Sequence, residues 1–443
     1  MNTLASIPGS PAGLPETLLL GLPPLQASPL PWINALRAEA VNRLDLLSLP
    51  TRRDEEWRFT DISPLKKLSL APALSAPHLE DAAIAHFYIE EATTRLVFVD
   101  GIYAPQLSST ASKGGVVVSN LAAVAATHAG VIEAHLGRHA AFRDNVFAAL
   151  NTAFLDDAAV IVVPRNVVLA APVQLLFIAT QKEVVSTPRC LVVAEAGSEA
   201  TVIEDYVVLN QSGWQEEAHL TNAVTEIVLE DNARVNHIRI QREDKKSFHI
   251  ANCAVSVGRS SNYQSVSVAL GARISRYNLE VMLAEGAECA LDGLALIAAN
   301  QLADTHTCID HAQPHGVSRQ LHKCIVDGSA HAVFNGKVMV RQGAQCTDSV
   351  QSSRNLLLTG KAQVDTKPQL EIFADDVKCA HGATIGQLDS EEVFYLKSRG
   401  LSDNVARSLL TYAFGAEIIE RIPVASLKQR LEQMVLKQTS SQS

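Results

Sequence analysis

The sequence has few aromatic residues, no long run of basic residues and no long apolar run. Phe, Trp and Tyr make up only 5% of its 443 residues, whereas hydrophobic residues make up 47%, so we expect an aliphatic core. No apolar run reaches about eighteen residues, which excludes an ordinary spanning helix. Without a run of Lys or Arg, and with a net charge of −10, the chain is not expected to bind nucleic acid or an anionic membrane.

Paired cysteines and targeting signals are missing as well. The seven cysteines are odd in number and form no C-x-x-C motif, which fits a reducing compartment better than a disulfide framework. No Lys or Arg precedes Arg37, which argues against an ordinary signal peptide and against an Arg-rich transit peptide. We therefore expect a cytoplasmic protein.

Two common catalytic motifs are also absent. At Gly360-Lys361 the Ser or Thr of a phosphate-binding loop is replaced by Ala362, and Asn355 stands where the leading Gly should be. No G-x-S-x-G nucleophile motif occurs either. We therefore expect that this chain binds no nucleotide and is not an enzyme.

The sequence divides into three regions. Residues 1–155 are expected to be mainly helical, with a loose tail at 1–30 that holds six prolines and a helix at about 131–155. Residues 156–388 consist of short β-rich runs separated by turn signals. Residues 389–443 are expected to form a second helical domain.

Turn signals recur at nearly constant spacing near the end of the central region. The markers Gly328, Gly343, Gly360 and Asp376 are 15, 17 and 16 residues apart, with no helical stretch between them. Such a repeat favours stacked rungs, as in a parallel β-helix. A β-sandwich also fits short strands with turns, and the periodicity alone favours the solenoid only slightly.

One cysteine and one histidine, Cys379 and His381, lie two residues apart in a segment that is expected to be a strand. Positions i and i+2 of a strand share a face, and a thiolate with an imidazole suits iron or zinc. Two ligands cannot complete a four-coordinate site, so a partner surface would have to supply the others. A buried Cys beside a hydrogen-bonded His, with no metal, fits the same pattern.

A second group of possible metal ligands lies in the segment T-H-T-C-I-D-H-A-Q-P-H. On a strand, His306, Cys308 and Asp310 share one face and His311 points away, so a single self-contained site is awkward. The sequence leaves the roles of His306, Cys308, His311 and His315 open.

Several motifs resemble the SufB/SufD family of the Suf iron–sulfur cluster assembly system. The segment around the Cys-His pair, DTKPQLEIFADDVKCAHGATIG, resembles the SufD signature. The segment that starts at Asp304 is similar to the family pattern D-T-x-T-x-aliphatic-acidic-His, in which His306 and Cys308 fall on variable positions. Six further motifs occur in the family's order: LPTRRDEEWRFT at 49–60, LVFVDGIYAPQLS at 96–108, AFLDDAAVIVVP at 153–164, SRQLHK at 318–323, FNG at 334–336 and FYLKSRG at 394–400.

This resemblance implies a right-handed parallel β-helix flanked by helical regions. It also implies a non-catalytic scaffold that pairs with the paralogue SufB and binds the ABC-type ATPase SufC, and it allows a reduced flavin in the complex. His381 matches the family's candidate ligand for a transient iron–sulfur cluster at the SufB–SufD interface, with Cys379 beside it. SufB-like sequences carry Glu at the position of Gly382 and Cys at that of Arg354, so the SufD branch is favoured.

The C-terminal region and the end of the β-region suggest two partner surfaces. Val405, Leu409 and Phe414 belong to an apolar stripe that we expect to dock SufC, although a helix that simply covers the solenoid has the same pattern. The segment 371–379 is expected to be an open strand edge. It would pair with SufB, and in isolation it would allow a homodimer.

A different class of function is a β-helix enzyme that acts on polysaccharide. Such enzymes usually have a secretion signal and an aromatic-lined cleft. This sequence has neither a recognisable signal nor many aromatic residues, so the scaffold is favoured.

Overall fold

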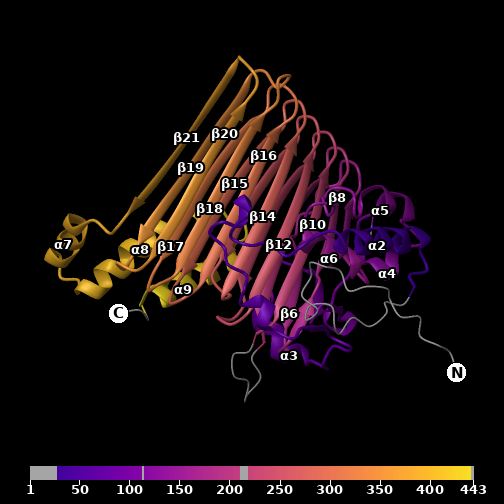
Figure 1. Cartoon of the computed structure of the whole chain (residues 1–443), viewed down its shortest axis with the longest axis horizontal. Coiled ribbons are helices and arrows are strands. Elements are labelled where there is room, and N and C mark those ends of the chain that lie inside the picture. The colour runs from indigo at the N-terminus through magenta and orange to yellow at the C-terminus, as the bar shows by residue number, and fades with distance from the viewer. Residues whose placement is uncertain (1–26, 112–113, 210–217, 441–443) are drawn as a thin grey trace.

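The computed structural model describes residues 27–111, 114–209 and 218–440. Two parallel sheets stack face to face and form a solenoid of about eight turns, with helices at both ends of the chain packed around it (Figure 1). The predicted parallel β-helix core with flanking helices is confirmed.

The strands of each turn are divided between the two sheets, because successive strands from β8 onward alternate from one sheet to the other. The first sheet contains, in spatial order, β20 (Gln363–Ile372), β18 (His331–Val340), β16 (Leu302–His311), β14 (Ile274–Leu283), β12 (Phe248–Val257), β10 (Leu220–Leu229), β8 (Arg189–Ala194), β5 (Ala159–Val163) and β4 (Val117–Asn120), with β1 (Ala71–Pro72) and β7 (Val184–Ser186) beside β10.

The second sheet runs alongside the first. It contains β21 (Val377–Gly386), β19 (Thr347–Leu357), β17 (Val317–Val326), β15 (Glu288–Ile297), β13 (Asn262–Ala269), β11 (Arg234–Arg242), β9 (Glu199–Val208), β6 (Val173–Ala179), β2 (Thr94–Val99) and β3 (Ile102–Tyr103). Only the β4–β5 and β2–β3 strand pairs are antiparallel among the described strands, and they close the N-terminal end of the solenoid.

The interior is built from aliphatic ladders because identical strand positions stack from turn to turn. Leu229, Val257 and Leu283 are paired in register and buried in one cluster. The turn markers lie in turns between strands, as expected. Gly328 has a φ of +63°, and a Cβ there would lie 2.9 Å from the backbone nitrogen of Ala299 in the neighbouring turn, so the close stacking of turns needs glycine at this position.

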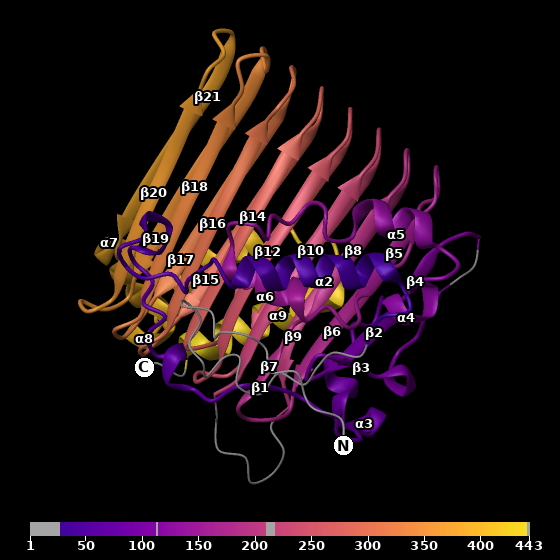
Figure 2. The ribbon, with the colours of Figure 1, turned by 45° about the vertical axis from the view of Figure 1, so that its right-hand side comes forward.

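Four N-terminal helices cover the outer face of the first sheet (Figure 2). They are α2 (Pro31–Leu44), α4 (Leu121–Val124), α5 (Ala129–His135) and α6 (Val146–Ala153), with short 3₁₀ turns at Glu55–Trp57 and Leu65–Lys67. Helix α3 (Asp81–Ile84) and the 3₁₀ turns at Ala85–Phe87 and Pro105–Leu107 pack instead against β2, β6 and β9 of the second sheet. The single helix expected at 131–155 is wrong. Gly137 separates α5 from α6, because its φ is +77° and its backbone lies against Leu36.

Of the three C-terminal helices, α8 (Asp403–Ile419) and α9 (Ala425–Ser440) cover the outer face of the second sheet, whereas α7 (Ser390–Ser398) projects beyond it (Figure 1). Ile418 of α8 and Leu427 and Leu431 of α9 are buried in one cluster with Val268 and Leu294 of the sheet. Much of the apolar surface of α8 and α9 therefore stabilises the solenoid.

The domain limits at 155 and 388 stay a prediction. Strands β2, β3 and β4 precede residue 155 and belong to the two sheets, so part of the expected helical region contributes to the solenoid. Of the tail expected at 1–30, residues 1–26 lie outside the described residues. No helix among the described residues is long and apolar enough to cross a membrane.

Candidate functional site

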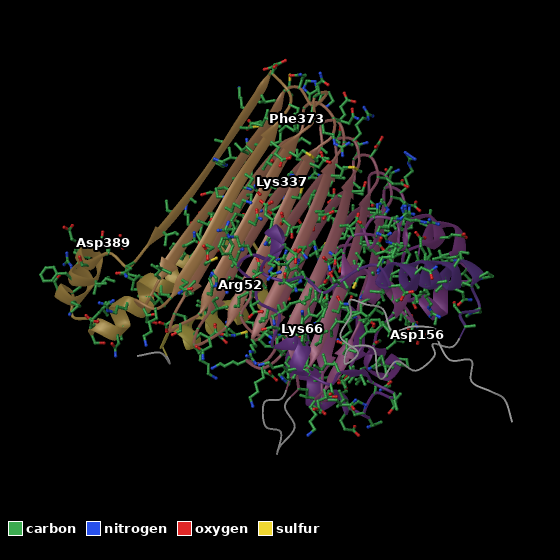
Figure 3. All side chains as sticks on the ribbon, viewed as in Figure 1. Arg52, Lys66, Asp156, Lys337, Phe373 and Asp389 are labelled. Atoms are coloured by element: carbon green, nitrogen blue, oxygen red, sulfur yellow. The ribbon has the colours of Figure 1, made fainter. Side chains whose placement is uncertain are left out.

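The C-terminal end of the solenoid is open. Within the described chain, β20 pairs only with β18 and β21 pairs only with β19, so both strands present an unpaired edge. Apolar side chains are exposed there, with Ile372 38%, Phe373 63% and Ile385 50% exposed; Figure 3 shows Phe373 in the turn at the top of these strands. The edge is longer than the segment 371–379 expected from sequence, which covers only this turn and the adjoining strand ends.

Cys379 and His381 both lie on β21, the outermost strand of the second sheet. Cys379 is half buried and packs against the interior cluster, and the strand's alternation puts His381 on the same, interior-facing side. His381 itself is exposed. Both side chains therefore lie at the mouth of the solenoid and share a face of the strand, and only the shared face was expected from their spacing.

The surroundings of Cys379 keep its thiol protonated near neutral pH. Partial burial raises the pKa of Cys379, and the backbone N–H of Ser349 opposes this only in part. No group of three or more His, Cys, Asp or Glu side chains that could hold a metal is found among the described residues. A metal bound by Cys379 and His381 would need further ligands from another molecule.

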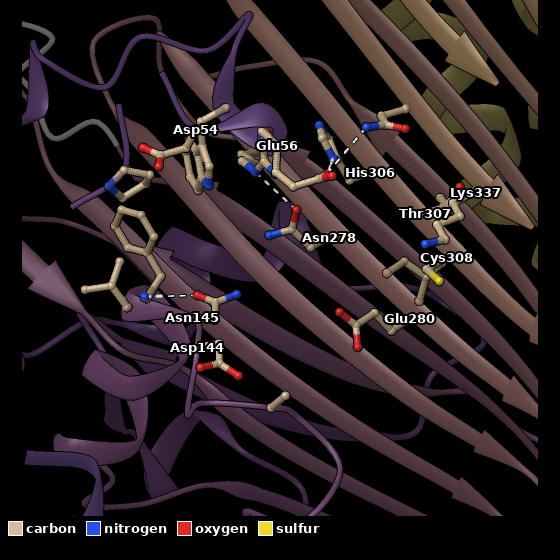
Figure 4. Close-up of a pocket in the computed structure, with 18 of the residues that line it drawn as sticks. Asp54, Glu56, Asp144, Asn145, Asn278, Glu280, His306, Thr307, Cys308 and Lys337 are labelled. Atoms are coloured by element: carbon tan, nitrogen blue, oxygen red, sulfur yellow. Dashed lines mark hydrogen bonds and ion pairs between the residues drawn. The ribbon is translucent and has the colours of Figure 1, made fainter. Parts of the chain in front are cut away.

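An N-terminal segment, residues 49–60, crosses the outer face of the first sheet, and we call it the strap. The Glu56 carboxylate lies 3.0 Å from His306 Nδ1 (Figure 4). His306 Nε2 lies 2.9 Å from Asp304 Oδ1. Arg276 donates to the Glu56 carbonyl at 2.7 Å, and its guanidinium lies 3.9 Å from the centre of the Trp57 ring. Contacts of Glu56 and Trp57 with charged side chains of the first sheet thus attach the strap to the solenoid.

A pocket of about 550 Å³ opens beside the strap (Figure 4). Its polar lining includes Glu280, His306, Cys308 and Lys337. Burial raises the pKa of Cys308 to about 11, and Lys337 Nζ is paired with Glu371 at 2.8 Å, so the thiol is not an activated nucleophile.

The segment from Asp304 to His311 has the orientation expected from sequence. His306 and Cys308 face outward into the pocket, whereas His311 is buried and its Nε2 lies 2.9 Å from Ser318 Oγ. His315 lies in the following turn with a φ of +62°. These four side chains therefore occupy three different environments.

The strap should be held most tightly at mildly acidic pH. Burial opposes ionisation of Asp304, but Arg276 and His306 outweigh burial and lower the pKa of Asp304 to about 2. The stabilisation that the Asp304 carboxylate gives to the attached strap is therefore lost as pH falls from about 4 toward 2. Burial opposes protonation of His306, but Asp304 and Glu56 outweigh burial and raise the pKa of His306. The stabilisation that protonated His306 gives to the attached strap is therefore complete below pH 6.5 and is lost as pH rises through the raised pKa.

Hydrogen exchange of the strap amides, corrected for intrinsic rates, measures this dependence. Protection should fall between pH 6 and 9, and His306→Gln should remove that fall. His78→Gln, which changes an exposed pair with Glu80, is the control. Equal protection at both pH values in the unmodified protein would contradict the prediction.

The predicted docking stripe is divided between two faces of α8. Val405 and Leu409, one helical turn apart, are 51% and 43% exposed. Phe414 is half buried against the second sheet, and Lys323 Nζ lies 4.4 Å from its ring centre. Phe414 therefore supports the attachment of α8 and does not belong to the exposed face.

Two exposed aromatic residues on α7 were missed by the sequence reasoning. Phe394 is 72% exposed and Tyr395 is 56% exposed. The motif FYLKSRG contains both, but only the structure shows that α7 projects from the solenoid and leaves them uncovered (Figure 1).

Comparison with known proteins identifies the family. Residues 24–175 match the SufBD protein N-terminal region, and residues 177–414 match the SufBD core domain of SUF system FeS cluster assembly. The chain belongs to the SufBD family. The family's N-terminal region thus includes α2 and the strap, and its core domain includes Cys379 and His381.

Individual SufBD relatives cover nearly the whole chain. An iron–sulfur cluster assembly SufBD family protein of Synechocystis is 44% identical over 407 residues, which are 90% of this chain and 89% of the relative. SufD of Escherichia coli is 35% identical over 432 residues, 93% of this chain and 97% of the relative. SufD of Bacillus subtilis is 25% identical over 414 residues, 91% and 93% of the two chains. The resemblance to this family is confirmed.

Proposed function

We propose that this chain is a non-catalytic, cytoplasmic scaffold subunit that builds iron–sulfur clusters together with SufB and the ATPase SufC. The observation that carries the proposal is the position of Cys379 and His381 on an end strand whose outer edge is unpaired, at the mouth of the solenoid. A partner strand added there would bring its own ligands beside them. The cluster is the cargo of this site, with His381 as ligand and Cys379 in an auxiliary role.

The test is anaerobic co-purification of the chain with and without SufB and SufC, followed by iron and sulfide analysis. We expect iron and acid-labile sulfide in the complete complex and much less with any subunit omitted. Equal amounts with this chain alone would contradict a shared site.

We propose that SufB pairs with the open edge of β20 and β21. Unpaired backbone groups at a sheet edge accept another strand with little sequence selectivity, so the same edge should also form a homodimer. When the isolated protein is mixed with SufB, size-exclusion chromatography with light scattering should show the homodimer exchanging one subunit for SufB.

Ile385→Lys should weaken both pairings, because it adds a charge beside the edge. Val168→Lys, a change at an equally exposed aliphatic side chain in the N-terminal part of the solenoid, should weaken neither. A stable homodimer that simply adds SufB would rule out one shared edge.

We propose that SufC docks on α7 and α8. Val405 and Leu409 of α8 and Phe394 and Tyr395 of α7 are apolar or aromatic side chains that this chain leaves exposed. Aromatic side chains are frequent among the residues that dominate binding energy in interfaces, which supports an extension of the surface onto α7.

A further inference from the structure

A ladder of hydrogen-bonded side chains runs through the interior of the last turns. Gln320 Nε2 on β17 donates to Thr307 Oγ1 on β16 at 2.9 Å, and Gln351 Nε2 on β19 donates to Gln320 Oε1 at 2.8 Å. All three side chains are buried. In the strand register the next position after Gln351 is His381 on β21.

Gln351 ends this ladder with an unused acceptor. Its side chain is 1% exposed, and its Oε1 has no hydrogen-bond partner among the described residues. A buried acceptor without a partner costs about 1–3 kcal/mol, so a donor that reaches this atom would be stabilised there. Paired positions on neighbouring strands lie about 4.8 Å apart, which puts the His381 ring within reach of this oxygen.

The amide nitrogen of Gln351 is bound by Gln320 and fits against Gly336, which leaves room for it. A Cβ at Gly336 would collide with that same nitrogen. Gly336 belongs to the FNG motif, and Thr307 belongs to the D-T-x-T motif, so both motifs support one side chain. Because Nε2 is engaged by Gln320, the amide presents its oxygen as the free atom.

The neighbouring interior column has the same construction. His311 Nε2 lies 2.9 Å from Ser318 Oγ, which donates to Ser349 Oγ at 2.7 Å, and Ser349 is paired in register with Cys379. Each member of the Cys-His pair is thus the last position of a polar ladder that begins on β16.

We propose that Gln351 is a positioning residue for His381. Its Oε1 accepts a hydrogen bond from one ring N–H of His381, which fixes the neutral tautomer and leaves the other ring nitrogen as the free electron-pair donor for iron. Histidine ligands commonly donate their second N–H to such an acceptor. The inference deepens the proposed function and depends on His381 being a ligand.

The test is nitrogen-15 NMR of the histidine rings in the isolated full chain without iron, with His381 assigned from the signal that is lost in His381→Ala. Gln351→Met keeps the length of the side chain and removes the acceptor. The ratio of the two neutral His381 tautomers should fall about fivefold toward that of a free imidazole, the effect of losing one ordinary hydrogen bond.

A second variant keeps the proposal testable if Gln351→Met disturbs the fold. Gln351→Glu keeps an acceptor oxygen at the same position and should preserve the tautomer ratio of neutral His381 that Gln351→Met loses. Gln301→Met is the control, since Gln301 is also a buried glutamine but supports the turn before β16 through the Ala272 carbonyl. Gln301→Met should leave the tautomer ratio of His381 unchanged.

The positioning role and the ligand role fail separately. If Gln351→Met leaves the His381 tautomers unchanged, or Gln351→Glu loses the tautomer preference as Gln351→Met does, the positioning role is overturned. If the His381→Ala complex contains normal iron and sulfide, the ligand role fails instead, and the NMR result is unaffected.

Discussion

His381→Ala should lower the iron and sulfide recovered with the anaerobic complex by about tenfold or more, since losing even a group that only supports a metal ligand commonly costs that much in affinity. His381 is exposed on an end strand, so the substitution leaves no cavity and should leave the fold intact by circular dichroism. Iron and sulfide are measured per complex after anaerobic size-exclusion chromatography.

The matched control is His78→Ala. His78 is an exposed histidine in the N-terminal region, 3.7 Å from Glu80, and it belongs to neither β20 nor β21. Its replacement should leave the iron content unchanged. Cys379→Ala should have a smaller effect than His381→Ala, and normal cluster content in His381→Ala would contradict the ligand role.

Leu409→Asp should abolish the pull-down of SufC. Leu409 is 43% exposed, so the charge is tolerated in the free chain. In the complex the same carboxylate would be buried without a partner, at a cost of several kcal/mol, and about 3 kcal/mol already weakens binding more than a hundredfold. Binding is measured by pull-down and by titration calorimetry with purified SufC.

Val41→Asp is the matched control for this experiment. Val41 is an aliphatic side chain on α2 with 49% exposure, and α2 covers the first sheet at the other end of the molecule (Figure 1). Circular dichroism should show an intact β-solenoid in both variants. Retained binding by Leu409→Asp would place the docking surface elsewhere.

Features that depend on local periodicity could be predicted from the sequence. The shared face of Cys379 and His381 follows from the two-residue repeat of a strand, and the shared exposure of Val405 and Leu409 follows from the helical repeat. The requirement for Gly328 follows from a backbone angle that other residues adopt with difficulty.

Features that depend on which strands become neighbours could not be predicted. The Gln351–Gln320 hydrogen bond joins residues 31 apart, and it exists only because β17 and β19 pair in one particular register. The second sheet partly covers Phe414, and the sequence of an isolated helix does not reveal which of its faces a sheet covers. The helical spacing of Phe414 alone fits either face.

The strap sets an order of events during synthesis. Glu55 lies in the strap and pairs with Lys367 of β20, 312 residues later in the chain. At about 5–20 residues per second, the N-terminal segment waits roughly 15–60 s for this partner to be made. In a solenoid each turn contacts only the turns next to it, so the last turns must be made before the strap can reach them. The strap can close fully only on a finished stack, and it then ties one of the earliest segments made to one of the last.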